Sequence, residues 1–398
     1  MSVPGPWLRT ARAAGLVDAD GIVQATVFAR MSAIAASRGA INLGQGFPDY
    51  DGPAEVLAAA ARAIADGANQ YPPGRGIPAL RRAIAAHQRR FHGLEWDADT
   101  EVLVTAGATE AIAASVLALV EPGDEVVVVE PFYDSYAALV GLAGGQLVAV
   151  PASAPDFLPE AGRLVDAIRD RTRVVLLNSP HNPTGAMLPA ETLRAVVDAA
   201  ARHDAVIVSD EVYEHLGFRA EHVSIAAVPG ARERSITISS AAKTFSVTGW
   251  KVGWITAPAP LLDAVLAVKQ FLTYVNGAPF QPAVALGLGL PDAVFDAAAS
   301  ALDARRARLT TALESAGFTV NRPHGGYFLI ADGTPLELTD AVTAAELLVD
   351  RAGVVAIPVT AFVTPGSRAA YAPYLRFAFC KRDEVIDEAA ARLAAFRP

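Results

Sequence analysis

Residues with chemically useful side chains follow four short apolar runs of the chain, at the point where each run ends. After the first run, Ala108 and Thr109 open directly into the apolar segment 110–120. The other three runs are followed by polar or reactive groups, which are Asn182, Asp210 with Tyr213, and Lys243. Each group alone has an ordinary structural explanation: a threonine helix cap, a turn amide, a helix-capping acid or partner of a buried cation, and a solvated lysine.

Together these groups indicate a cofactor. Open α/β sheets bind ligands beyond the carboxyl ends of their strands, so the groups would meet at one sheet edge. A helix start that binds phosphate, an amide, an acid, a tyrosine and a lysine would then surround one ligand. A phosphorylated pyridine aldehyde needs this set, because a lysine Schiff base and a carboxylate at the ring nitrogen hold it. The pattern therefore predicts a pyridoxal 5′-phosphate site.

The elements that must position these groups form a regular alternation. Seven β-branched apolar runs alternate with helical stretches, at 101–107, 124–131, 145–151, 173–180, 205–211, 235–241 and 251–257. Most runs are continuously apolar, as expected for strands that helices cover on both faces. We expect an α/β fold with a doubly wound, mostly parallel, seven-stranded sheet.

The alternation of apolar runs and helical stretches ends at about residue 290. A long helical stretch is followed by the strand patterns GGYFLIAD and YLRFAFCK, which predict a second, smaller α+β domain. We expect residues 1–45 to form an arm and part of this small domain, 46–290 the large cofactor-binding domain, and 291–398 the small domain. Helices are expected at about 54–66 and 79–91.

Composition excludes several classes of protein. The chain has 398 residues, of which 52% are hydrophobic and 19% charged, so disorder and disulfide scaffolds are excluded. A net charge of −9 argues against a nucleic-acid partner or a polybasic membrane surface. The single cysteine, Cys380, cannot form an internal disulfide and is expected to be inert core. We expect a soluble, cytoplasmic protein with no membrane partner.

The chain resembles the class I/II pyridoxal-phosphate aminotransferases of fold type I. The similarity extends from NLGQGFPD to YLRFAFCKRD, and the lysine segment SAAKTFSVTGWKVG follows the family signature at almost every position. One departure is Lys251, which stands where many members carry arginine. A lysine keeps the positive charge but loses the bidentate fork of a guanidinium.

The resemblance implies roles for the residues around the cofactor. Lys243 would be the Schiff-base lysine, and Asp210 would pair with the protonated pyridine nitrogen. Tyr213 and Asn182 would hydrogen-bond the phenolic oxygen, and Tyr133 would stack on the ring. The phosphate would be held by the backbone amides of Ala108 and Thr109, by Ser240 and by Lys251. Lys243, Asp210 and Tyr213 are the predicted catalytic residues.

The resemblance also implies a substrate site and a dimer. Arg376 would bind the substrate α-carboxylate with two hydrogen bonds, and Gly46 would contribute its backbone to the same carboxylate. Asn182 and Phe47 would contact substrate as well, with Phe47 in the side-chain pocket. Tyr71 matches a tyrosine that reaches the phosphate of a neighbouring subunit, which implies a homodimer with shared active sites.

Several motifs narrow the branch of the family. GQGFPD, EPFYDSY, SPHNPTG and SDEVYEHL are similar to kynurenine, glutamine-K and methionine aminotransferases, and to the N-succinyldiaminopimelate aminotransferases of lysine biosynthesis. NQYPPG, ISSAAK, GAPFQPAVAL and FCKRDEVIDEA are most similar to the last group. We expect transfer between N-succinyl-LL-diaminopimelate and 2-oxoglutarate/glutamate. The alternatives are a broad kynurenine, glutamine or methionine aminotransferase and a cysteine-conjugate C–S β-lyase.

The histidines do not form a recognisable metal motif. No HExxH or closely spaced ligand set occurs among the seven, so we expect no metal. Glu214, His215 and His222 are interpreted as surface or capping residues.

Overall fold

The computed structural model describes residues 5–18, 20–218 and 220–398, and its largest unit is an eight-stranded sheet. The strands lie in the order β2-β9-β8-β7-β6-β3-β4-β5. Their bounds are β2 Val102–Thr105, β3 Glu125–Glu130, β4 Gln146–Ser153, β5 Leu158–Pro159, β6 Thr172–Asn178, β7 Val206–Asp210, β8 Ser235–Ser240 and β9 Gly253–Thr256. The sheet is mostly parallel; β9 runs antiparallel to both of its neighbours, and β5 runs antiparallel to β4.

All seven predicted strands are present, and the α/β fold is confirmed. The eighth strand, β5, was not predicted, because a two-residue strand carries no periodic signal. The small α+β unit described below also occurs, but the predicted boundaries between domains remain a proposal.

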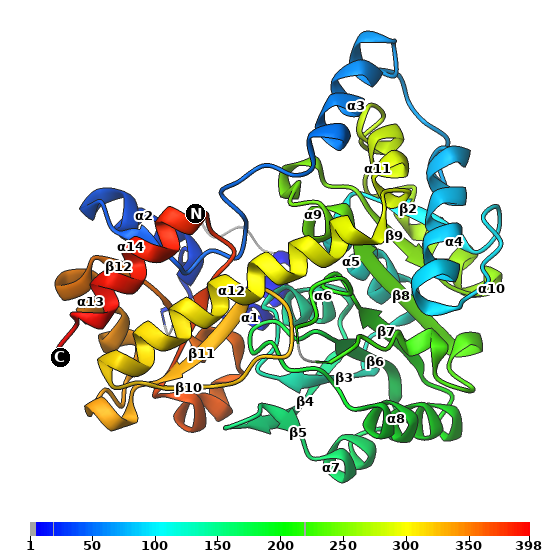
Figure 1. The fold of residues 1–398 in the computed structure, drawn as a ribbon. Coiled ribbons are helices and arrows are strands. Elements are labelled where there is room, and N and C mark those ends of the chain that lie inside the picture. The colour runs from blue at the N-terminus through cyan, green and yellow to red at the C-terminus, as the bar shows by residue number, and fades with distance from the viewer. Residues whose placement is uncertain (1–4, 19, 219) are drawn as a thin grey trace.

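Helices cover both faces of this sheet, as Figure 1 shows. On one face, Val126 and Val128 of β3 pack in a cluster with residues of α5 (Gly107–Leu119), α6 (Ser135–Ala143) and α10 (Ala259–Lys269). On the other face, Val127 and Val129 pack with residues of α7 (Ala161–Asp166) and α8 (Ala190–Arg202). Successive side chains of a strand point to opposite faces, so burial on both faces explains the uninterrupted apolar runs.

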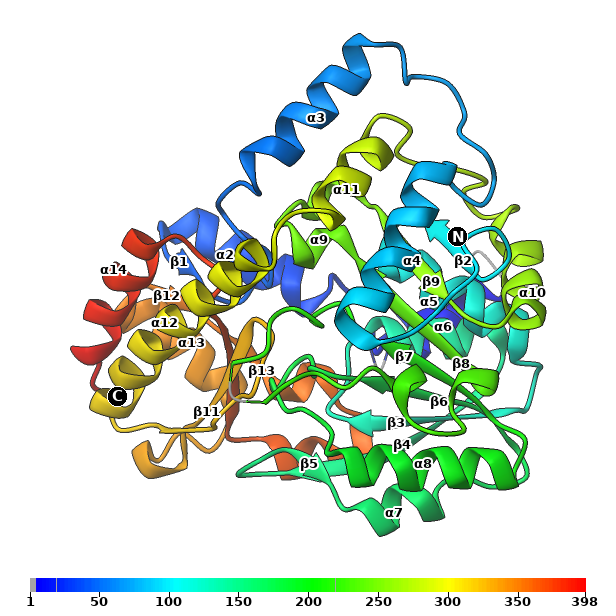
Figure 2. The same ribbon diagram turned by 45° about the vertical axis from the view of Figure 1, so that its right-hand side comes forward.

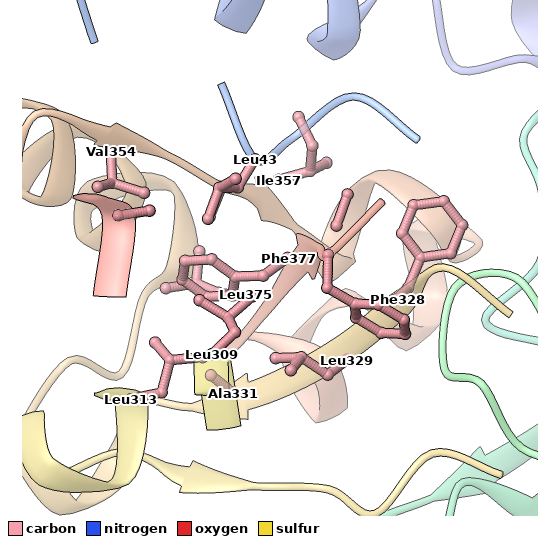
Figure 3. Packing of buried hydrophobic residues seen from close by; sticks show 14 of the residues in the cluster. Leu43, Leu309, Leu313, Phe328, Leu329, Ala331, Val354, Ile357, Leu375 and Phe377 are labelled. Atoms are coloured by element: carbon pink, nitrogen blue, oxygen red, sulfur yellow. The ribbon is translucent and has the colours of Figure 1, made fainter. Parts of the chain in front are cut away.

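The C-terminal part is built on a four-stranded antiparallel sheet in the order β10-β11-β14-β13. The strands are β10 Thr319–Val320, β11 Phe328–Asp332, β13 Ile357–Pro358 and β14 Tyr374–Ala378. The helices α2 (Val27–Arg38), α13 (Ala341–Ala352) and α14 (Asp383–Ala394) pack against the same core. Figure 3 shows this core, in which Leu309 and Leu313 of a long helix lie beside Leu375 and Phe377 of β14.

The N-terminal segment joins this C-terminal core. Met31 and Ala35 of α2 are buried in it, and β1 (Ile41–Asn42) pairs in parallel with β12 (Val354–Val355). A short helix, α1 (Trp7–Ala13), packs instead on α6 of the large sheet and was not predicted. Residues 1–4 and 19 of the predicted arm lie outside the described residues.

One helix, α12 (Asp292–Ala316), connects the two units, and Figures 1 and 2 both show it extending from beside α11 to the C-terminal sheet. Its first turns bury Phe295 in a cluster with residues of the large unit. Leu302 and Leu309 are buried in the C-terminal core. The junction between the units is therefore a continuous helix.

Of the remaining α-helices, α9 carries residues of the active-site cavity, while α3 and α4 pack on α11. These helices are α3 Ala54–Ala65, α4 Pro78–His92, α9 Ala241–Thr244 and α11 Phe280–Leu288, and the first two match the predicted helices closely. Among the described residues, no single helix has both the length and the apolar character needed to cross a membrane. By length and composition alone α11 and α12 would qualify as a pair, with a 93° bend between them.

Candidate active site

A cavity of about 460 Å³ opens at the carboxyl ends of β2, β6, β7 and β8. Every predicted site residue except Tyr71 lines it. These residues are Gly46, Phe47, Ala108, Thr109, Tyr133, Asn182, Asp210, Tyr213, Ser240, Lys243, Lys251 and Arg376. The structure thus brings together groups that lie more than three hundred residues apart at the extremes of the chain.

Lys243 lies on α9, the short helix that follows β8. Ser240 begins this helix, and its hydroxyl accepts a hydrogen bond from the Ala242 amide at 3.2 Å. The Lys243 amine donates to the Gly46 carbonyl at 3.2 Å and lies 5.3 Å from the centre of the Tyr327 ring. No described carboxylate forms an ion pair with this amine, and burial lowers its pKa. A buried amine with a lowered pKa can act as a nucleophile and a base.

Asp210 ends β7 and is 5% exposed. The Tyr136 hydroxyl donates to one of its carboxylate oxygens at 2.6 Å, and the Val212 amide lies 3.4 Å from the other. Burial raises the pKa of Asp210 to about 6. An acid in this position matches the protonated ring nitrogen of pyridoxal phosphate, whose charge would restore the ionised form.

The start of α5 forms one end of the cavity. Its N-cap residue is Ala106, which provides no side-chain cap, and Thr109 lies inside the first turn. The explanation of Thr109 as a helix cap is therefore wrong. First-turn amides have no partner within the helix and carry the positive end of its dipole, so they are suited to an anion.

A cation lies beside this helix start. A Cβ atom on Gly107 would lie 3.4 Å from the Lys251 amine, which places that amine over the first turn of α5. Lys251 has a φ of 53°, and its carbonyl accepts a hydrogen bond from Asn276 at 2.8 Å. The Ser240 hydroxyl also lines this end of the cavity. Free amides, an ammonium group and a hydroxyl together fit a phosphate group. The geometry of this end of the cavity therefore agrees with the predicted cofactor.

Arg376 lies on β14, at the opposite side of the cavity, and is 2% exposed. Its guanidinium donates to the Gly44 carbonyl at 2.6 Å and to Asn182 Oδ1 at 3.0 Å. The guanidinium carbon lies over the ring of Phe328, 4.0 Å from the ring centre. No described acid pairs with it, its Nε has no partner, and burial lowers its pKa to about 10. A buried guanidinium without an acid partner suits a substrate carboxylate.

Two supporting residues were not predicted. Asn178, at the end of β6, accepts a hydrogen bond from the Asn182 amide at 2.7 Å and donates to the Asp210 carbonyl at 2.8 Å. It therefore links the Asn182 turn to the Asp210 strand. Tyr136, which binds Asp210, lies three residues after Tyr133, and the two rings contact each other edge to face at 5.7 Å. Asn178 ends an apolar run, and that position is the signal that could have found it.

Gly46 and Phe47 form part of the cavity wall. A Cβ atom on Gly46 would lie 2.2 Å from the ring of Phe328, so no side chain fits there. In the structure the Gly46 carbonyl accepts from Lys243, while the carbonyl nearest Arg376 is that of Gly44. Phe47 is 47% exposed and its carbonyl accepts from Lys381 at 2.7 Å.

Tyr71 lies outside this cavity. It is 82% exposed, and its ring packs edge to face with that of Tyr274, 5.6 Å between centres. Phe271 and Leu272, which are also exposed, lie close to Tyr274 in the sequence. A role for Tyr71 in a neighbouring subunit remains a prediction.

The interpretation of Glu214 and His222 as surface or capping residues is wrong. Both side chains are buried, and with Glu211, His87, His92 and His215 they form what we call the histidine–glutamate cluster. His92 contacts Glu214 at 2.7 Å, and His222 contacts Glu211 at 3.0 Å. By spacing alone, His87, Glu214 and His215 could hold a metal ion, but the ring nitrogens of His87 and His215 lie 2.6 Å apart and bond to each other.

Comparison with known proteins agrees with this geometry. The family model described as aminotransferase class I and II matches residues 38–393. The chain is 53% identical to the probable N-succinyldiaminopimelate aminotransferase DapC of Mycobacterium tuberculosis, over 93% of this chain and 95% of the relative. The solved structure of the M. tuberculosis enzyme has a TM-score of 0.90 and covers 93% of this chain and 97% of that one.

More distant relatives have other substrates in their names. The methionine aminotransferase of Escherichia coli is 39% identical over 92% of this chain and 95% of the relative. The human kynurenine–oxoglutarate transaminase 3 is 34% identical over 92% of this chain and 87% of the relative. The predicted resemblance to these three groups is confirmed.

Proposed function

The chain belongs to the class I and II aminotransferases, which depend on pyridoxal 5′-phosphate, and we propose that it transfers an amino group between N-succinyl-LL-diaminopimelate and 2-oxoglutarate. One observation carries the chemical part of this proposal. Three buried charged groups, Lys243, Asp210 and Arg376, line one cavity, and none has an ion-pair partner among the described residues. The cavity is therefore prepared for a cofactor and a substrate that supply the missing charges.

The cofactor, when bound, withdraws electrons from the substrate α-carbon. The residues of the chain do the rest. Lys243 would hold the cofactor aldehyde at rest, and its Nζ would take the proton from the substrate α-carbon. Asp210 would keep the ring nitrogen protonated, and Asn182 and Tyr213 would hydrogen-bond the phenolic oxygen. Arg376 binds the α-carboxylate and so fixes the direction of the bond that loses its proton.

The substrate part of the proposal is supported by similarity. The relative at 53% identity is named for N-succinyldiaminopimelate, whereas the relatives named for methionine and kynurenine are 39% and 34% identical. 2-Oxoglutarate is proposed as the amino acceptor by the same resemblance. An enzyme with these substrates would act in lysine biosynthesis.

A homodimer is part of the same proposal. The exposed aromatic residues Tyr71, Phe271 and Tyr274 are difficult to reconcile with a surface that stays in water. Burial of Tyr71 against a second copy would also bring it toward the partner's phosphate site. Sedimentation of the wild type and of a Phe271→Asp variant would test this, and a wild-type monomer would contradict it.

A single-turnover experiment tests the reaction and the substrate together. The purified holoenzyme is mixed with N-succinyl-LL-diaminopimelate, kynurenine, methionine or glutamate, and the absorbance band of the lysine-bound cofactor is followed. We expect the fastest loss of the band with the succinylated substrate and its recovery on addition of 2-oxoglutarate. Faster loss with kynurenine or methionine would favour a broad aminotransferase. Release of pyruvate and ammonia from a cysteine conjugate, with no need for a keto acid, would favour a β-lyase.

A further inference from the structure

A second cavity, of about 640 Å³, lies next to the active site. It is formed by the loop after α1, the start of α2 and the two turns η5 (Val359–Phe362) and η6 (Pro365–Tyr371). Thr26 and Asp134 line both this cavity and the active-site cavity. These two residues therefore lie between the two cavities, on the side of the active site from which a long substrate side chain would reach the second cavity.

Three arginines line the second cavity: Arg12, Arg30 and Arg368. They come from three separate segments, α1, α2 and η6. All three are exposed, and no side chain of the three forms an ion pair or hydrogen bond with a described residue. The Arg368 guanidinium lies beside the loop after α1, because a Cβ atom on Gly15 would lie 3.9 Å from it. We call this cavity the arginine antechamber.

Among the described residues, the two acids of the antechamber, Asp134 and Asp340, form no ion pair with these arginines. Asp340 begins α13, and its carboxylate accepts from the Thr343 amide at 3.0 Å and the Thr343 hydroxyl at 2.6 Å. Burial raises the pKa of Asp134, which favours its neutral form. Three guanidinium groups thus remain available to an anion that enters the cavity.

We propose that the arginine antechamber binds the distal carboxylates of a long amino-acid substrate. The inference rests on the proposed function, because it assumes that Arg376 holds the α-carboxylate at the other end. N-succinyl-LL-diaminopimelate carries two carboxylates beyond its reacting end, one on the second amino-acid centre and one on the succinyl group. Guanidinium groups bind carboxylates with paired, charge-assisted hydrogen bonds. Methionine and kynurenine carry no distal carboxylate and would gain nothing from these contacts.

The test removes the arginine charges and compares a charged with a neutral substrate. Arg12→Gln, Arg30→Gln and Arg368→Gln are made singly and together in the holoenzyme, and KM and kcat are measured with N-succinyl-LL-diaminopimelate and with methionine. We expect each single change to raise KM for the succinylated substrate about three- to tenfold and the triple change at least about thirtyfold, as for the loss of charge-assisted hydrogen bonds. The KM for methionine should stay within about twofold. The wild-type KM for the succinylated substrate should also rise in 0.5 M salt, because salt screens exposed charges.

Arg194→Gln is the matched control, since Arg194 is an exposed arginine of α8 that lines neither cavity. It should leave both KM values unchanged. Equal effects of the antechamber variants on both substrates, or no effect on either, would overturn the inference while the proposed function stands. A wild type that takes no amine from N-succinyl-LL-diaminopimelate would instead overturn the proposed function. The KM of the same variants is then measured with 2-aminopimelate, which carries a distal carboxylate, and with norleucine, which carries none. A KM for 2-aminopimelate that does not change when the arginines are replaced would also overturn the inference.

Discussion

Two buried polar regions share the segment from the end of β7 onward, and they differ in how their charges are satisfied. Asp210 and Tyr213 line the active-site cavity. Glu211 and Glu214, from the same segment, belong to the histidine–glutamate cluster instead. Adjacent residues of one short segment thus serve a site that needs a ligand and a network whose acids find their donors within the protein.

In the histidine–glutamate cluster each acid has its donors inside the protein. Glu211 accepts from Ser209 at 2.8 Å, from the Ile225 amide at 2.9 Å and from His222. Glu214 accepts from Ser239 and His92. Burial opposes ionisation of Glu214, but the hydrogen bond from His92 and the neighbouring histidines outweigh it and hold its pKa below the usual range.

In the active site burial is not balanced in this way. It raises the pKa of Asp210 to about 6, lowers that of Lys243 and lowers that of Arg376 to about 10, so all three are displaced toward their neutral forms. A cofactor and a substrate with complementary charges would reverse these shifts. The acids show the difference most clearly: burial raises the pKa of Asp210, whereas donors within the histidine–glutamate cluster hold the pKa of Glu214 below its usual range.

The largest expected effect is that of Lys243→Ala on turnover. The amine is both anchor and base, so we expect kcat to fall at least about 10⁴-fold. The measurement is steady-state transamination in a buffer free of added amines, together with the absorbance band of the bound cofactor. His92→Gln, in the histidine–glutamate cluster, is the control and should cost less than about tenfold in kcat. A normal rate for the lysine variant would contradict its assignment.

Asp210→Asn should have the next largest effect. An amide cannot hold the ring nitrogen in its charged form, so we expect kcat to fall about 10³-fold, comparable with the loss of a strong preorganised electrostatic contact. The fall is measured with the cofactor at saturating concentration, which separates chemistry from binding. A loss below tenfold would remove the distinction between Asp210 and the acids of the cluster.

Arg376→Gln should affect substrate binding more than cofactor binding. Loss of a charge-assisted pair in a buried site should raise the KM for the amino acid about 30- to 100-fold. The cofactor should stay bound, which absorbance of the dialysed protein checks. Loss of the cofactor instead would show that this guanidinium serves another purpose.

The smallest change in activity, but a clear change in stability, is expected for His92→Gln. The free energy of unfolding should fall by about 3 kcal/mol at pH 6, because Glu214 loses its buried partner. The pKa of His92 is raised in the folded protein: burial lowers it, but Glu214 outweighs this. Its stabilising contribution is therefore fully present below the unperturbed pKa of 6.5 and is lost as the pH rises through the raised value.

Urea unfolding of wild type and variant between pH 5 and 9 measures this difference. His203→Gln is the matched control, because His203 pairs with Asp170 at the surface and should contribute less than about 1 kcal/mol. A difference between wild type and His92→Gln that grew with increasing pH would contradict the assignment of the His92–Glu214 pair.

Much of the fold was predictable because it depends on local patterns. Strands buried on both faces are continuously apolar, so all seven long strands could be recognised without any contact information. Helices α3 and α4 could be recognised from the helical periodicity of their apolar residues. The strand β5, with two residues, and the helix α1, with seven, are too short to carry a reliable pattern.

The cofactor side of the site was predictable for a topological reason. Parallel strands end at one edge, so residues that follow the runs must meet there. Asn178 and Tyr136 were not found, because their roles depend on contacts with Asp210, which lies 32 and 74 residues further along the chain.

The sequence by itself determined which residues follow the strands, and hence the chemistry that the cavity can perform. Only the tertiary structure decided which charges are satisfied. His92 and Glu214 are 122 residues apart and pair, whereas the Arg376 guanidinium, 194 residues from Asn182, meets an amide, a carbonyl and aromatic rings and pairs with no described acid. Electrostatic pairing depends on distance in space and on local burial, and neither can be read from spacing along the chain.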